Sequence, residues 1–220
     1  MMPPHPFLVG VTGGIGSGKS TLCRFLEEMG CELFEADRVA RELQLSDPEI
    51  IEGISALFGR DVYSRSSDGS LLLDRKRIAR EVFSHPATLG ALNRLIHPKV
   101  YAAFRQRAAE SYARGTSVLV MEAAILFETG RASELDFVVV VAAQNETRIR
   151  RAVSRGLGTP EEVRRRMALQ WPQETLVSKA DYVVYNNASR DELRVEAERL
   201  FGVLREAAGG SAVDRKGKRR

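Results

Sequence analysis

Near the start of the chain stands Gly13-Gly14-Ile15-Gly16-Ser17-Gly18-Lys19-Ser20-Thr21, a run that fits the pattern G-x-x-x-x-G-K-[ST]. An apolar stretch of strand character, residues 7–12, comes before it, and residues 19–29 carry apolar side chains at helical spacing. Strand, glycine loop and helix in this order form the P-loop arrangement, whose backbone N–H groups point inward toward phosphate oxygens. The helix N-terminus adds the favourable end of its dipole. The sequence therefore predicts a nucleoside triphosphate site rather than a glycine-rich turn without a ligand.

Two side chains of this loop have expected tasks of their own. Lys19 would reach the β- and γ-phosphates of ATP, which makes it a candidate catalytic residue. The Ser20 hydroxyl would complete the ligand shell of Mg²⁺ and is the candidate metal ligand. The loop as a whole would hold the ATP through Gly13, Gly14, Ile15, Gly16, Ser17, Gly18, Lys19, Ser20 and Thr21.

Five short strands alternate with helices along the chain. Their apolar runs are expected at residues 7–12, 31–35, 116–122, 136–142 and 181–186. Such alternation predicts an α/β fold of the P-loop NTPase type, in which helices cover both faces of a five-stranded parallel sheet. Glu122 ends the third of these strands, at the position of a Walker B-type carboxylate. The sequence leaves open whether Glu122 assists the metal.

Two largely helical segments are expected beside this core. We predict a discontinuous nucleotide-binding core over residues 6–36, 115–143 and 177–206, and a nearly all-helical, acceptor-binding insertion over residues 37–114. Within the insertion, a capping box of Ser46 with Glu49 would start one helix, residues 64–70 would form a polar loop, and His97-Pro98 would open a long helix. Residues 144–176 would form a lid, and residues 207–220 a disordered basic tail.

Charge and composition limit the possible partners. Of 33 basic and 29 acidic residues, five bases and one acid fall in the last seven positions, which leaves 28 of each elsewhere. A neutral body argues against nucleic acid as a partner. Cys23 and Cys31 lack the spacing of metal ligands and are expected as reduced thiols, and no apolar run reaches transmembrane length. We therefore expect a soluble, cytoplasmic protein without a membrane partner; its oligomeric state is left open.

The segment from residue 148 to residue 166 favours a kinase among the P-loop proteins. It holds seven arginines and no lysine, and the planar guanidinium suits phosphate oxygens. A capping box at 159–162 divides the segment into two helices, as in a lid that closes over ATP and excludes water. The N-K-x-D pattern of GTPases is absent, and the only D-x-x-G match lies at residues 214–217 in the basic tail.

From residue 9 to about residue 204 the chain resembles the dephospho-CoA kinase family. The resemblance is carried by the P-loop, by Glu35-Ala36-Asp37-Arg38-Val39-Ala40-Arg41, by Ile96-His97-Pro98 and by Leu126-Phe127-Glu128, in the family's order. One departure is Glu35, where the family usually has Asp. The resemblance implies that ATP phosphorylates the ribose 3′-hydroxyl of dephospho-CoA, the final step of coenzyme A synthesis, with Mg²⁺ present.

The same resemblance implies roles for residues outside the P-loop. Asp37 would orient the acceptor hydroxyl or accept its proton, although the sequence is equally compatible with a helix N-cap at this position. Arg151 and Arg155 would be lid contacts to ATP. The acceptor would be bound by Arg41, His97 and Glu128, although the sequence is also compatible with His97 as a helix cap before Pro98 and with Glu128 as the start of a loop.

Two other functions remain open at this point. The same P-loop and lid would serve a kinase for another nucleoside or nucleotide, with a different acceptor pocket. A P-loop switch or ATPase that binds nucleic acid through its basic tail would belong to another class.

Overall fold

The structure, a computed structural model, describes residues 5–210, apart from the side chains of residues 83, 84 and 86. The chain divides into two compact units. One unit consists of Met1–Glu35 with Arg107–Arg220, and the other of Ala36–Gln106. In the described part of the chain, no helix is both long and apolar enough to cross a membrane.

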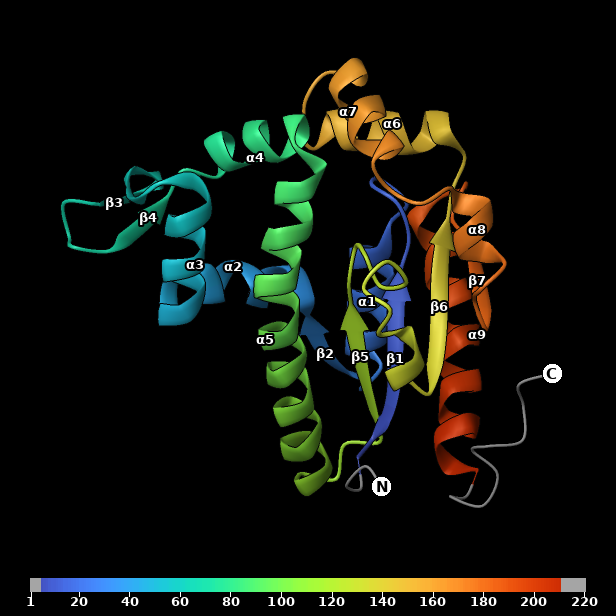
Figure 1. Ribbon diagram of the computed structural model, residues 1–220. Coiled ribbons are helices and arrows are strands. Elements are labelled where there is room, and N and C mark those ends of the chain that lie inside the picture. Colours follow the sequence, from blue (N-terminus) through green and yellow to red (C-terminus); the bar gives the residue numbers. More distant parts are fainter. Residues whose placement is uncertain (1–4, 211–220) are drawn as a thin grey trace. The chain divides into compact units, whose positions relative to one another are not determined.

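The first unit contains the predicted five-stranded parallel sheet, which is confirmed (Figure 1). Its strands lie in the order β2-β5-β1-β6-β7, so the strand before the P-loop is central. The strands are β1 (Phe7–Thr12), β2 (Glu32–Glu35), β5 (Val118–Glu122), β6 (Phe137–Ala142) and β7 (Tyr182–Tyr185). Because all five are parallel, their carboxyl ends meet at one edge of the sheet, the edge at which ligands bind in such folds.

Helices α1 (Lys19–Glu28) and α9 (Arg190–Gly209) cover one face of this sheet. Alternate residues of β1 point into this core, and α9 presents Leu193, Ala197 and Leu200 to it. A capping box starts α9: Ser189 and Glu192 stand three positions apart in the sequence, the spacing that predicts such a box, and both of its hydrogen bonds are present. Because α9 continues through Gly209, residues 207–209 are helical, which corrects the start of the predicted disordered tail; its last ten residues lie outside the described residues.

The opposite face of β1 meets the segment that follows β5. A Cβ atom at Gly10 would lie 2.5 Å from a Leu135 methyl carbon and 2.6 Å from one of Leu126. The glycine therefore lets these two buried leucines lie directly on the strand. Both cysteines are buried free thiols, and burial raises the pKa of Cys31 to about 12, which keeps this thiol protonated. This agrees with the expectation of reduced thiols.

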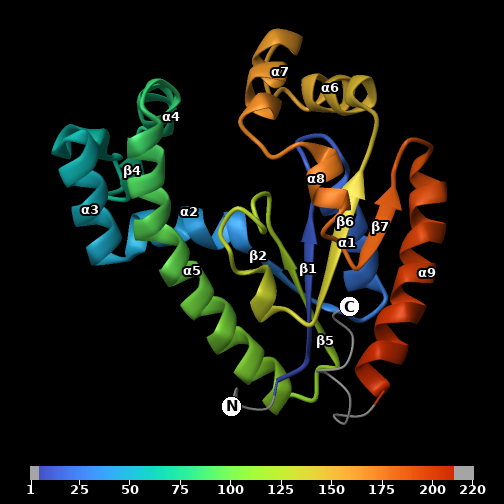
Figure 2. The same ribbon diagram turned by 45° about the vertical axis from the view of Figure 1, so that its right-hand side comes forward.

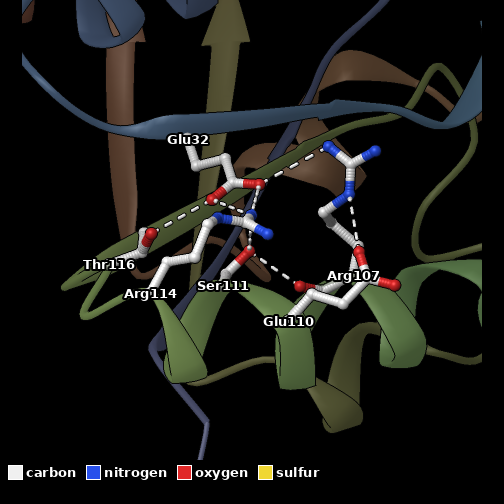
Figure 3. Close-up of polar contacts among 6 residues, drawn as sticks. All are labelled: Glu32, Arg107, Glu110, Ser111, Arg114 and Thr116. Carbon is white, nitrogen blue, oxygen red and sulfur yellow. Dashed lines mark hydrogen bonds and ion pairs between the residues drawn. The ribbon is translucent and has the colours of Figure 1, made fainter.

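A polar cluster ties the start of β2 to the end of helix α5 (Pro86–Ala113) (Figure 3). Arg114 donates to both oxygens of Glu32, at 2.7 and 2.9 Å, and Thr116 donates at 3.1 Å. Burial acts to raise the pKa of the Glu32 carboxyl, but hydrogen bonds from Ser111, Arg114 and Thr116 outweigh it and lower that pKa. The charged form of Glu32 therefore stabilises the folded state.

We expect Glu32→Gln to lower the free energy of unfolding by about 1 kcal/mol at pH 7, since the amide keeps the shape but loses the charge-assisted bonds. A carboxyl whose pKa is lower in the folded protein stabilises it above the unfolded pKa, about 4.3, and this contribution is lost as the pH falls through the folded pKa. Urea titrations from pH 7 to pH 3 should show the two proteins converging at the acid end. The exposed Glu28, paired with Arg194, provides the control Glu28→Gln; an equal loss there would contradict the special role of Glu32.

Three helices follow β6 in the same unit: α6 (Asn145–Ser154), α7 (Pro160–Ala168) and α8 (Gln173–Val177). The predicted capping box of Thr159 with Glu162 opens α7. Both α6 and α7 lie beyond the carboxyl ends of the strands in two views of the molecule (Figures 1 and 2). The arginine-rich segment is thus a helical pair beside the P-loop edge of the sheet.

The second unit is mostly helical, with one exception that the sequence did not reveal. Its elements are α2 (Ala36–Ser46), α3 (Pro48–Phe58), the 3-10 turn η1 (Arg60–Val62), β3 (Tyr63–Arg65), β4 (Leu71–Leu73), α4 (Arg75–Ser84) and most of α5. The antiparallel hairpin β3–β4 corrects the expectation of a nearly all-helical insertion, because the predicted polar loop joins two three-residue strands.

Two helix starts in this unit differ from the predictions. The cap of α3 is Asp47, which accepts from the N–H groups of Glu49 and Ile50, while Ser46 donates to the Glu42 carbonyl. The predicted capping box of Ser46 is therefore wrong. Helix α5 does not begin at Pro98 but contains it, having begun at Pro86. Proline within a helix removes one N–H bond and is tolerated here over a 28-residue helix.

Candidate active site

The loop between β1 and α1 has the backbone that a phosphate nest requires. Gly18 is the N-cap of α1 at φ 102°, without a side-chain cap, and the first turn carries no acidic residue. The positive end of the helix dipole is thus left for an anionic ligand. Gly13 has φ 144°, and a Cβ atom there would lie 2.3 Å from the Val141 carbonyl oxygen. Only glycine fits this close approach of the loop to β6.

The polar side chains of the loop gather around the ends of β1 and β5. Lys19 Nζ donates to the Gly13 carbonyl at 2.7 Å, so its ammonium lies across the loop. The Ser20 hydroxyl donates to Glu122 Oε1 at 2.6 Å. The acid that ends β5 therefore meets the candidate metal ligand, although 102 positions separate them in the sequence.

This pair of oxygens fits a magnesium ion. Hydroxyl and carboxylate oxygens are the hard ligands that Mg²⁺ prefers, and the ion commonly binds one or two protein oxygens together with substrate phosphates and water. Among the described residues there is no group of three or more His, Cys, Asp or Glu side chains that could hold a metal. A site completed by the nucleotide's phosphates agrees with both observations.

Buried oxygens without a partner lie within this region. In the described part of the chain these are Thr12 Oγ1, Ser17 Oγ and Glu128 Oε2. An unpaired buried polar atom destabilises a protein and calls for an explanation such as a missing ligand or water. Ser17 lies within the P-loop and Thr12 directly before it, whereas Glu128 ends the Leu-Phe-Glu run that is predicted to bind the acceptor.

A cavity of about 440 Å³ opens beside the C-terminal end of the P-loop. Four arginines and no acid line it, and two of these arginines, Arg151 and Arg155, were predicted as ATP contacts. Burial, followed by the charges of Arg150 and Arg155, lowers the pKa of Arg151, as expected for crowded guanidinium groups. An anionic ligand would relieve this crowding. The lining residues are Gly18, Thr21, Arg24, Arg151, Ser154, Arg155, Asn186, Arg190 and Leu193.

The sequence did not single out three of these residues, Arg24, Asn186 and Arg190, as ligand contacts. Asn186 donates to the Ser17 carbonyl at 2.7 Å, while Arg151 donates to the Asn186 carbonyl at 2.8 Å. Asn186 thus links α6 to the P-loop. Arg24 lies on α1 and Arg190 begins α9, positions at which a single arginine carries no recognisable signal in the sequence.

The second unit brings together two of the residues assigned to the acceptor side. Asp37 lies exposed in the first turn of α2, one residue inside the helix, so it is not the N-cap that the sequence left possible. Burial lowers the pKa of His97, and the nearby Asp37 carboxylate acts in the opposite direction. Arg75 donates to the Arg41 carbonyl at 3.2 Å, and the charge of Arg41, after burial, lowers the pKa of Arg75. This unit therefore holds an acid beside a histidine and, separately, two adjacent arginines.

A P-loop at the central strand, a serine–carboxylate pair and an arginine-rich helical pair after β6 together define a P-loop kinase. A sequence model of the family described as Dephospho-CoA kinase matches residues 7–192. A Chlorobium luteolum protein named dephospho-CoA kinase is 74% identical over 220 residues, which cover 100% of each chain. The chain belongs to the dephospho-CoA kinase family.

Two solved structures share this fold. A Thermus thermophilus protein is 32% identical with a TM-score of 0.73, and the match covers 91% of this chain and 99% of that one. A dephospho-CoA kinase from Campylobacter jejuni, 22% identical, has a TM-score of 0.64 with 93% and 98% covered. At that identity the second likeness supports the fold alone.

Proposed function

We propose that this chain transfers the γ-phosphoryl group of ATP to the ribose 3′-hydroxyl of dephospho-CoA, giving CoA and ADP, the final step of coenzyme A synthesis. Family membership over residues 7–192, joined to an intact P-loop, carries this conclusion. The 3′-oxygen forms a bond to phosphorus and the bond from phosphorus to the bridging β,γ-oxygen breaks. The hydroxyl proton passes to a base.

The phosphate chain of ATP would be held by the first unit. Phosphoryl transfer depends mainly on positioning and on neutralising the charge of the transferred group. The P-loop N–H groups and the open end of α1 receive the phosphates, with Lys19 at the β- and γ-positions. Arg151 and Arg155, which line the adjacent cavity, add positive charge from the lid side.

Magnesium would be held by Ser20, with Glu122 as the acid that orients the serine hydroxyl or joins the ligand shell. Held there, magnesium would supply positive charge that offsets the negative charge of the phosphate oxygens. The 2.6 Å hydrogen bond between Ser20 and Glu122 supports this assignment, because two oxygens this close together can serve the same metal ion.

We expect Glu122→Gln to raise the Mg²⁺ concentration for half-maximal turnover by about tenfold, the scale on which loss of a metal's outer partner weakens its site. The amide keeps the size of the side chain but loses its charge. Steady-state rates across a Mg²⁺ titration at fixed ATP measure the change. A variant with reduced turnover but an unaltered Mg²⁺ requirement would place Glu122 outside the metal site.

The acceptor hydroxyl would be oriented by Asp37, which then takes its proton. Within its own unit, the Asp37 carboxylate lies close enough to His97 to act on the pKa of that side chain, which supports a common role of the two residues toward the acceptor. We assign Arg41, His97 and Glu128 to the binding of dephospho-CoA, with the unpaired oxygen of Glu128 in support. We place this reaction in the cytoplasm, consistent with two free thiols.

A panel of acceptors tests the proposed function. The protein should release ADP rapidly with dephospho-CoA, and at least a hundredfold more slowly with adenosine, AMP, other nucleosides or shikimate at equal concentration. The reason is that an acceptor site built with specific polar contacts discriminates by factors of about 10² or more. Faster turnover of another nucleoside or nucleotide would identify that molecule, rather than dephospho-CoA, as the acceptor. The assignment of the protein as a kinase would be unchanged.

A further inference from the structure

The tip of the P-loop, Ile15, is held at three points by α6, α7 and Gln170, which follows α7. Its N–H donates to Gln170 Oε1 at 2.9 Å, and its carbonyl accepts from Arg148 Nε at 3.0 Å. Its side chain packs against the small apolar cluster of α6 and α7. That cluster consists of Ile149, Ala152 and Val163, with Val153 and Met167 at its border.

Arg148 is unusual among the arginines of this segment, because it is only 5% exposed and does not face solvent. Its Nη1 donates to Asn145 Oδ1 at 3.2 Å, while its guanidinium covers Gly14, where a Cβ atom would lie 1.9 Å from Nη2. Burial lowers its pKa, opposed by the charge of Glu174. A buried arginine that donates to a loop carbonyl fixes that loop more firmly than an exposed side chain would.

The backbone of α6 touches the same loop directly. A Cβ atom at Gly16, whose φ is 73°, would lie 2.2 Å from the Arg148 carbonyl oxygen. Loop residues 14–16 are thus packed between the side chain and the backbone of Arg148. The N–H of Ile15, in addition, donates to Gln170. The groups that make these contacts take no part in the phosphoryl transfer proposed above. The proposed mechanism therefore does not explain the contacts.

We propose that Arg148 and Gln170 are positioning residues that hold the P-loop tip in its phosphate-binding shape and tie it, through Ile15, to the lid helices. A nest binds phosphate well only when its N–H groups already point inward, since ordering a mobile loop costs binding free energy. Fixing the N–H and the carbonyl of one residue removes both peptide rotations that would open the loop. The inference rests on the proposed function only in taking ATP as the ligand.

The chain contains a matched control for this inference. Gln173 lies three positions after Gln170, and its Oε1 accepts from the N–H of Ala143 at 3.0 Å. Both glutamines therefore make one side-chain contact of the same kind with a backbone N–H, but only Gln170 contacts the P-loop. Methionine has nearly the size of glutamine and cannot make either contact with comparable strength.

The test compares Gln170→Met with Gln173→Met by calorimetric titration with ATP and Mg²⁺, by thermal unfolding and by steady-state kinetics. Both variants should lose similar thermal stability. Gln170→Met alone should weaken ATP binding by about fivefold to tenfold, the scale of one hydrogen bond, and raise the KM for ATP equally, with the KM for dephospho-CoA unchanged. Equal ATP affinity in the two variants would overturn the proposal and leave Gln170 a merely structural residue.

A second arm uses Arg148→Met alone and together with Gln170→Met. Both residues act on the same loop tip. The double variant should therefore lose less free energy of ATP binding than the two single variants lose in total. Full additivity would mean that the two residues act independently and would contradict the shared role. If Arg148→Met does not fold, the two glutamine variants decide the question.

The same experiments separate this inference from the proposed function, because ATP binding is measured directly. A protein that binds ATP without phosphorylating dephospho-CoA would disprove the proposed function, and the ATP affinities of the variants would still test the inference.

Discussion

Replacing Lys19 by alanine is expected to lower turnover by at least about a thousandfold, the range over which a single positioned cation acts in phosphoryl transfer. The ammonium lies across the P-loop on the Gly13 carbonyl, where it would meet the β- and γ-phosphates. Nothing in the apolar core depends on it, because the side chain projects from the first turn of α1 into the loop. The fold should therefore persist while the reaction almost stops.

The measurement is steady-state ADP release with dephospho-CoA, beside a thermal unfolding curve on the same preparation. Lys179→Ala is the control, since Lys179 is an exposed lysine that follows α8. It should retain normal turnover. Near-normal turnover of Lys19→Ala would show that the phosphates bind elsewhere and would remove the P-loop from the mechanism.

Replacing Asp37 by asparagine is expected to reduce turnover by about 10²-fold or more, the contribution of a general base, while ATP binding stays unchanged. Asparagine keeps the shape of the side chain and removes the charge that would accept the hydroxyl proton. Since Asp37 is exposed in the first turn of α2, it contributes to stability mainly through the helix dipole, an effect of about 0.3–1 kcal/mol.

Asp191 provides a matched control for that dipole effect, because it occupies the same place in the first turn of α9. Asp191→Asn should change the unfolding midpoint as much as Asp37→Asn and leave turnover unaffected. An ATP titration separates binding from chemistry. Unchanged turnover in Asp37→Asn would exclude the proposed base, whereas equal losses of turnover in both variants would reduce its role to helix stability.

The sequence was sufficient where one local signal determines one local structure. The glycine run with its flanking strand and helix predicted the P-loop, and the β-branched strand at 137–142 could be placed because buried parallel strands are continuously apolar. Capping boxes before α7 and α9 were readable because their side chains lie only three residues apart. The cap at Asp47 was missed although Pro48, which favours the first helical position, points to residue 47 rather than Ser46.

Contacts between distant segments could not be predicted in the same way. The hairpin at 63–73 has three-residue strands, too short for a period of two to stand out. The bonds from Arg148 and Gln170 to Ile15 join residues 133 and 155 positions apart. In the sequence Arg148 is simply one more arginine of the lid, and only its burial distinguishes it from neighbours that face solvent.

The most direct test of the account is the structure of the product that the purified protein makes from dephospho-CoA, ATP and Mg²⁺. A phosphorus NMR spectrum should show one new phosphomonoester resonance, coupled to the ribose H3′ proton, appearing at the same rate as ADP. That result would establish transfer to the 3′-hydroxyl. A phosphomonoester at the 2′-position, or inorganic phosphate released in place of any new ester, would contradict the proposed reaction.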